Sequence, residues 1–178
     1  QSASAAALPA EAAPLAAETA ARVEKIKRDY EEVRAKAAAD YAAAGKEFSG
    51  GLNSLLRQLA LLEREKRADL AAVLTPRQME DLELRETTAG QTVQRLLGDT
   101  TASDEQRRAV FRLQFEFEDR FALTFELSPA ALLERETAQQ QLNEEIRTVL
   151  GDTLFAAWLR GEGSEYAPMA ALAARQGL

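Results

Sequence analysis

The stretch Leu74-Thr75-Pro76-Arg77-Gln78 stands between two segments with a helical period and carries three signals for the start of a helix. The hydroxyl of Thr75 can accept a hydrogen bond from the backbone of the first turn, and the side chain of Gln78 can reach back to the Thr75 N–H. Proline is favoured at the first position of a helix, where Pro76 stands. We therefore expect a helix to begin here.

Two apolar stripes precede this stretch, each with residues spaced three and four apart. The first runs along residues 17–48 and the second along 52–73, and a Ser-Gly-Gly sequence at 49–51 separates them. Two such stripes joined by a glycine turn predict an antiparallel helical hairpin. The side chains expected to face inward on its second helix are Leu52, Leu55, Leu56, Leu59, Leu62, Leu70 and Val73.

Caps and glycines after the stretch predict several further helices in quick succession. A third helix should begin at Thr75, with a possible break near 87–90, and a fourth at the Ser103–Gln106 capping box. A fifth should run from Ser128-Pro129 to about Val149, followed by a short sixth after Gly151-Asp152 and a seventh over 167–176. The side chains expected to face inward on the fifth are Leu132, Leu133, Leu142, Ile146 and Val149.

One segment, residues 111–127, has a pattern that fits two structures. Phe111, Leu113, Phe115 and Phe117 alternate with polar residues, as in a strand, and the alternation resumes after Arg120. The same segment also carries a helical stripe, and it follows the cap at 103–106. We favour a helix, because a two-stranded hairpin would be marginal among helices.

Composition agrees with an all-α protein of 178 residues. Hydrophobic residues make up 46% of the chain, many of them alanine, while Gly (9) and Pro (5) are scarce. No apolar run approaches the ~20 residues that span a membrane, so we expect no membrane span. We divide the chain into a flexible Ala-rich tether (1–16), an elongated helical hairpin (17–73) and a compact multi-helix unit (74–178).

Charge is distributed unevenly along the chain. Residues 1–78 hold 12 basic and 11 acidic residues (+1), residues 79–178 hold 10 and 18 (−8), and the sum is the net charge of −7. A nucleic-acid partner is therefore not expected, because contacts to phosphates require a basic face.

The chain has no His and no Cys, which excludes most routes to catalysis. Ser-His and Cys-His nucleophiles, zinc thiolates and iron–sulfur sites all need one of these residues. Neither a GxxxxGK[ST] nor a GxGxxG loop is present. Paired carboxylates remain, but acidic residues at this density usually form a solvated helix face. We expect no enzymatic activity, no cofactor and no metal site.

The aromatic residues cluster, since five of the seven Phe fall between positions 111 and 125. One interpretation places them in the core. The other makes them an exposed apolar surface with an acidic rim, which would bind other polypeptides. The residues of this candidate surface are Phe111, Phe115, Phe117 and Phe121, with Glu116, Glu118 and Asp119 as the rim.

Residues Leu74, Thr75, Pro76 and Gln78 resemble the LTxxQ motif of the Spy/CpxP-like periplasmic proteins, a family of helical chaperones and envelope-stress sensors. More broadly, the span 61–166 resembles uncharacterised exported bacterial helical proteins. The resemblance implies an all-helical, dimerising, periplasmic or otherwise exported protein whose leader is not visible. Two features depart from the family: the usual second copy of the motif is missing, and without His the metal sensing of some relatives does not carry over.

Two functions are compatible with these observations. The first is a non-enzymatic envelope protein that binds other polypeptides, chaperone-like or sensor-like, through the Phe surface. The alternative is a structural or accessory subunit that docks through its N-terminal helical hairpin. Both imply protein partners, and we expect the protein to form a homo-oligomer.

Overall fold

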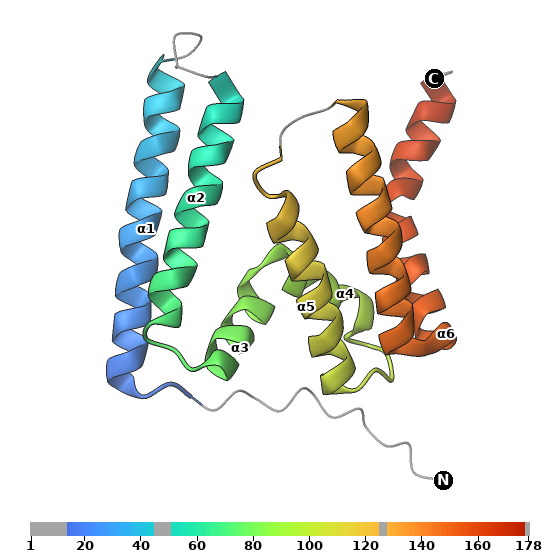
Figure 1. Cartoon of the computed structure of the whole chain (residues 1–178), viewed down its shortest axis with the longest axis horizontal. Helices are drawn as coiled ribbons and strands as arrows, with labels where there is room; N and C mark the ends of the chain where they lie inside the picture. Colours follow the sequence, from blue (N-terminus) through green and yellow to red (C-terminus); the bar gives the residue numbers. More distant parts are fainter. Residues whose placement is uncertain (1–13, 45–50, 125–127, 177–178) are drawn as a thin grey trace. The chain divides into compact units, whose positions relative to one another are not determined.

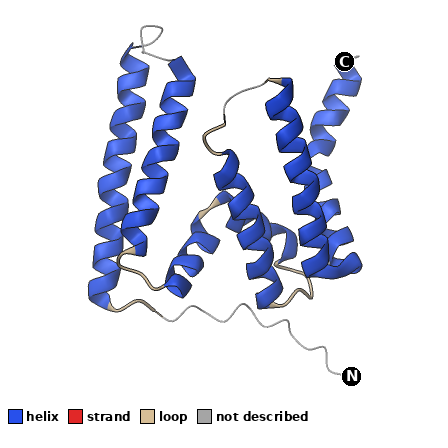
Figure 2. Cartoon of the chain, viewed as in Figure 1, coloured by secondary structure: helices blue, strands red, loops and turns tan. Residues whose placement is uncertain are grey.

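The computed structural model describes residues 14–44, 51–124 and 128–176, with side chains up to residue 161. All regular elements in these ranges are helices (Figures 1 and 2), which confirms the all-α prediction. The helices are α1 (Ala17–Ala44), α2 (Gly51–Ala71), α3 (Pro76–Glu86), α4 (Thr88–Leu97), α5 (Asp104–Phe121) and α6 (Pro129–Gln176). None of the described helices is long and apolar enough to cross a membrane.

The described residues form two compact units. The hairpin unit contains residues 14–44, 51–83 and 119–124, and the core unit contains residues 84–118 and 128–176. The boundary between them therefore falls at residue 84, ten residues beyond the expected one at 74. The reason is that most of α3 packs with the hairpin, as its core residues show.

The hairpin unit is built from α1 and α2, which run antiparallel side by side (Figure 1). The Tyr30 hydroxyl donates a hydrogen bond of 2.8 Å to the Asp69 carboxylate across the two helices. This bond, aided by partial desolvation, raises the pKa of Tyr30 to about 12. At the root of the hairpin a small apolar core joins α3 to both helices; its buried members are Val23, Leu70, Leu74 and Leu82.

The core unit surrounds the only Trp of the chain, Trp158, which is fully buried. Large side chains from α4, α5 and α6 fill the space around it, and α4 contacts α6 directly. The largest of the fully buried side chains are Trp158, Phe111, Leu97, Ile146, Val93 and Val110. A core of this size explains why short helices such as α4, which would be marginal alone, are ordered here.

Side-chain caps start the helices where the sequence predicts them. The Thr75 N–H donates to Gln78 Oε1 (3.0 Å) while the Thr75 hydroxyl accepts from the Gln78 N–H (3.3 Å). Ser103 and Gln106 form the same reciprocal pair, at 2.9 and 3.1 Å. The possible break near 87–90 is a real helix boundary, because the Thr87 hydroxyl accepts from the Gly90 N–H and caps α4.

Two expectations about the C-terminal half need comment. Residues 104–121 form one continuous helix, so the helical interpretation of 111–127 holds as far as Phe121; residues 125–127 lie outside the described part. The predicted boundary between the fifth and sixth helices is confirmed, because α6 consists of two helical stretches that meet at Gly151, where the backbone is not helical (φ 72°, ψ 166°). The second stretch is not short, and no separate seventh helix begins at 167, because the chain stays helical to residue 176. Glycine permits this positive φ at little cost.

A substitution at Gly90 tests how closely α4 approaches the chain before it. A Cβ at Gly90 would overlap the backbone carbonyl of Leu84, which cannot move aside as a flexible side chain would. We expect Gly90→Ala to lower the free energy of unfolding of the core unit by about 2 kcal/mol, despite the higher helix propensity of alanine. Urea unfolding followed by Trp158 fluorescence measures this unit, and exposed Gln91→Ala is the control. Equal stability of G90A and Q91A would show that the contact is not tight.

Candidate functional site

The predicted Phe surface is not a single exposed surface in the structure. Phe111 is only 2% exposed and belongs to the core around Trp158. Phe115 and Phe117 are partly buried against the same core, and the Phe115 ring lies 5.5 Å from that of Phe111. Phe121 is also buried, but it belongs to the hairpin unit. The core interpretation is therefore correct for Phe111, and Phe121 is buried as well, but not in the core around Trp158.

The acidic rim residues have three different environments. Glu116 is exposed. Glu118 is partly buried, and burial raises the pKa of its carboxyl, while hydrogen bonds with the Gln114 side chain and the Ala89 backbone lower it in part. Asp119 pairs with arginines. The three acids thus do not act together as the rim of one surface.

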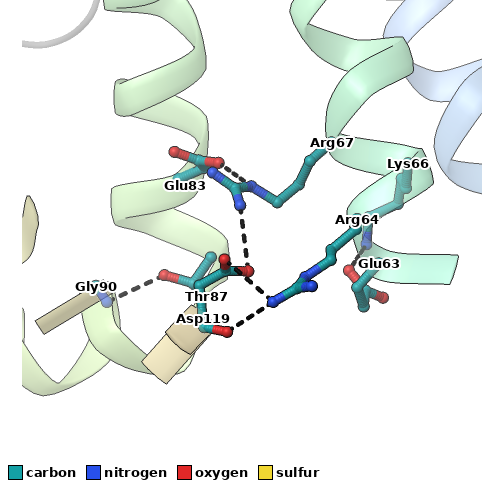
Figure 3. A network of polar contacts seen from close by, with 8 residues as sticks. All are labelled: Glu63, Arg64, Lys66, Arg67, Glu83, Thr87, Gly90 and Asp119. Carbon is teal, nitrogen blue, oxygen red and sulfur yellow. Dashed lines mark hydrogen bonds and ion pairs between the residues drawn. The ribbon is translucent and has the colours of Figure 1, made fainter. Parts of the chain in front are cut away.

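Asp119 belongs to a network of four charged residues within the hairpin unit (Figure 3). Arg67 Nε donates to the Glu83 carboxylate at 2.7 Å, and Arg67 Nη1 lies 3.6 Å from Asp119 Oδ1. Arg64 Nη2 donates to the backbone carbonyl of Asp119 at 2.8 Å and lies 3.4 Å from its carboxylate. The network therefore ties α2 to α3 and to the last turn of α5.

The position of Asp119 explains why two arginines are placed around it. The C-terminal end of a helix carries a partial negative charge, so a carboxylate in the last turn of α5 is unfavourable by itself. Arg64 offsets this charge and donates to the Asp119 carbonyl, which also accepts from the Ala122 N–H (3.3 Å) just past the helix end. Two cations and two anions balance in the network, so its chemistry suits fixing helix ends rather than capturing a charged ligand.

The LTxxQ-like motif residues are occupied with the start of α3. Thr75 and Gln78 bond to each other as described above, and Pro76 is the first residue of the helix. Leu74 is buried in the core at the root of the hairpin. Every one of these contacts serves the local fold.

Leucines that the sequence places inside the hairpin emerge at its surface instead. Leu52 is 53% exposed and Leu56 37% exposed, whereas Leu55 between them is buried. The expectation that Leu52 and Leu56 face inward is therefore wrong. The antiparallel partner of this end of α2 is residues 35–44 of α1, seven of which are alanine, and alanine is too small to cover both leucines. The scarcity of large side chains in residues 35–44 is the sequence feature from which the exposure of these leucines could have been predicted.

Leu132 and Leu133, also expected to face inward, are exposed near the start of α6. Core packing of α6 begins farther along the helix, at Ala138, Leu142 and Ile146. These two leucines precede the first buried turn, which is the physical reason for their exposure.

Comparisons with known proteins identify no relative of this chain. No protein-family model, curated protein or solved structure matches the chain. The LTxxQ resemblance stays a prediction. Among the described residues, no group of three or more acidic side chains is placed to hold a metal ion.

The network can be tested by a double-mutant cycle on Arg67 and Glu83. We expect a coupling free energy of about 0.5–1 kcal/mol at low salt, because the pair is only partly shielded from solvent. Screening in about 1 M NaCl should reduce it. Urea unfolding followed by circular dichroism measures each corner, and the exposed Lys36–Asp40 pair of α1 provides the control cycle. A coupling no larger than that control would contradict a role in fixing the helices.

The raised pKa of Glu118 predicts a pH-dependent stability. A carboxyl whose pKa is higher in the folded than in the unfolded protein favours folding when protonated, so this contribution is present below the usual value of 4.5 and is lost as the pH rises through the raised pKa. Glu118→Gln should therefore stabilise the protein at pH 7, and the gain should vanish near pH 4. Thermal unfolding across this range, with exposed Glu116→Gln as control, measures it. A less stable E118Q at pH 7 would mean that the charged carboxylate is favoured by its bond to the Ala89 backbone.

Proposed function

We propose that this chain is a non-enzymatic accessory protein that docks another polypeptide on α2, near the tip of its helical hairpin. The observation that carries the proposal is the exposure of Leu52 and Leu56, two leucines one helical turn apart. Covering the part of these side chains that is still exposed would contribute on the order of 1 kcal/mol each, which a binding partner can supply.

The surroundings of these leucines support recognition by apolar packing. Residues 51–62 of α2 contain one charged residue, Arg57, which lies on a different face of the helix from Leu52 and Leu56. Helices commonly bind partners through apolar side chains at positions i and i+4. The pattern is therefore typical of a helix that packs against another helix.

A chaperone-like cradle has less support than docking. Two of the four Phe residues expected to form an aromatic surface for unfolded segments, Phe111 and Phe121, are buried. Docking through the hairpin needs only the side chains that are exposed. The envelope location that the LTxxQ resemblance implies is part of this proposal and rests on that resemblance alone.

Site-specific photocrosslinking in cells that make the protein tests this function. A photoreactive residue in place of Leu56 should give one or a few discrete adducts, because a docked partner has a fixed identity. The same residue in place of Leu61, which is 47% exposed on the opposite face of α2, is the matched control. A continuous smear of adducts at position 56 would favour binding of unfolded clients, and equal yields at both positions would contradict docking at this face.

A further inference from the structure

We propose that the part of α6 after Gly151 is a hinged flap on the core around Trp158, and that the side chain of Gln106 holds this flap closed. The flap is defined as residues 152–161, whose side chains are described. The hinge, the flap and Gln106 all belong to the core unit, so this proposal does not depend on docking at α2.

Gly151 provides the hinge. Its φ of 72° and ψ of 166° interrupt α6 with a backbone conformation that residues with a side chain rarely adopt, and α6 changes direction there (Figure 1). A Cβ at Gly151 would meet no atom within 4 Å. Rotation of the backbone at this residue is therefore not opposed by close packing on the side where a side chain would stand.

Apolar contacts hold the flap on the core. Trp158 is fully buried, and Leu154 and Phe155 are partly buried against the same core. The backbone at Gly161 comes so close to α4 that a Cβ there would overlap the Leu96 side chain. The large ring of Trp158 is the main anchor among these contacts, because it buries the most apolar surface.

The anchor also has a polar group that favours opening. The Nε1 atom of Trp158 is buried and has no hydrogen-bond partner within the described part of the chain. Burying an N–H without an acceptor costs free energy, and this cost is recovered when the group reaches water. The closed flap is therefore less stable, relative to an open one, than the burial of the ring alone would make it.

Gln106 favours the bent form of α6 over a straight one. Its Oε1 accepts from the Ser103 N–H (2.9 Å), while its Nε2 donates to the backbone carbonyl of Val149 (3.0 Å), two residues before the hinge. In a straight helix this carbonyl would accept from the N–H four residues farther along, at Thr153. Because Gln106 supplies another donor, the carbonyl is satisfied while α6 stays bent.

A second contact across the hinge is weaker. Arg147 Nε donates to the Asp152 carboxylate at 2.8 Å, but both side chains are exposed, and exposed ion pairs contribute little to stability. The bond from Gln106 is partly buried and is therefore the stronger restraint. When α6 straightens, Trp158 leaves the core, and the core unit changes from a closed form to one with exposed apolar surface.

Hydrogen exchange of the purified full chain, read by mass spectrometry of its peptides, tests whether the flap opens by itself. Amides of residues 154–161 should exchange about tenfold faster than those of residues 142–150, because opening of the flap leaves the first stretch of α6 folded. Equal exchange rates in the two segments would mean that they open only together, and this result would overturn the proposal.

Gln106→Glu separates the restraint on α6 from the capping of α5. Glutamate still accepts from the Ser103 N–H, as in other capping boxes, but its carboxylate cannot donate to Val149. The opening equilibrium constant of residues 154–161 should rise about fivefold or more, while that of residues 142–150 stays unchanged. Gln78→Glu, the same change in the capping box of α3, is the matched control and should affect neither segment.

Gly151→Ala acts on the hinge instead. Alanine is strained at a φ of 72° and favours a straight helix, so opening should again increase. Acrylamide should then quench the fluorescence of Trp158, the only Trp, more strongly than in the wild type. Gly51→Ala is the control, because Gly51 has a similar φ of 60° and also has no atom near its Cβ position.

Circular dichroism of each variant verifies that the helices are retained. If neither Q106E nor G151A opens the flap more than its control does, or if both speed exchange equally in residues 142–150 and 154–161, the proposal is overturned.

Discussion

The supply of large apolar side chains is the constraint on which this structure depends. The core unit has enough of them: Phe111 and Trp158 are buried together with the leucines of α4. The hairpin has too few, because alanine dominates the end of α1 that faces the start of α2. One part of the chain therefore closes around its aromatic residues, and the other leaves leucines in water. The candidate binding surface follows from this imbalance, since it lies where the chain could not cover itself.

Polar contacts play a different part, which is to fix the ends of helices. Thr75, Thr87 and Ser103 cap helix starts, and Arg64 takes the corresponding role at the C-terminal end of α5. Each such contact satisfies backbone groups that a helix leaves unpaired. The acidic residues of α5 illustrate how local position decides a role: Glu116 stays in solvent, Glu118 is partly buried, and Asp119 is held by arginines.

Much of this fold is encoded locally and could be predicted from the sequence. The capping boxes at 75–78 and 103–106 depend on residues three apart, so reading the chain identifies them, and the helical class follows from period and composition. Exposure depends instead on what another segment presents. Period alone placed Leu52 inside, although in the structure it is 53% exposed. The Phe residues could not be divided between surface and core for the same reason. Phe111, Phe115 and Phe117 pack in the core around Trp158, more than 35 residues farther along the chain, whereas Phe121 is buried in the other unit.

The uneven charge of the chain affects which partners can approach its exposed leucines. Apolar contacts attract without regard to identity, so an exposed pair of leucines needs another property to limit its partners. A near-neutral pair of hairpin helices in a chain whose net charge is −7 supplies one. Other acidic proteins are repelled by the whole molecule, while a neutral helical surface can approach these leucines at close range, where repulsion between distant acidic residues is screened by salt.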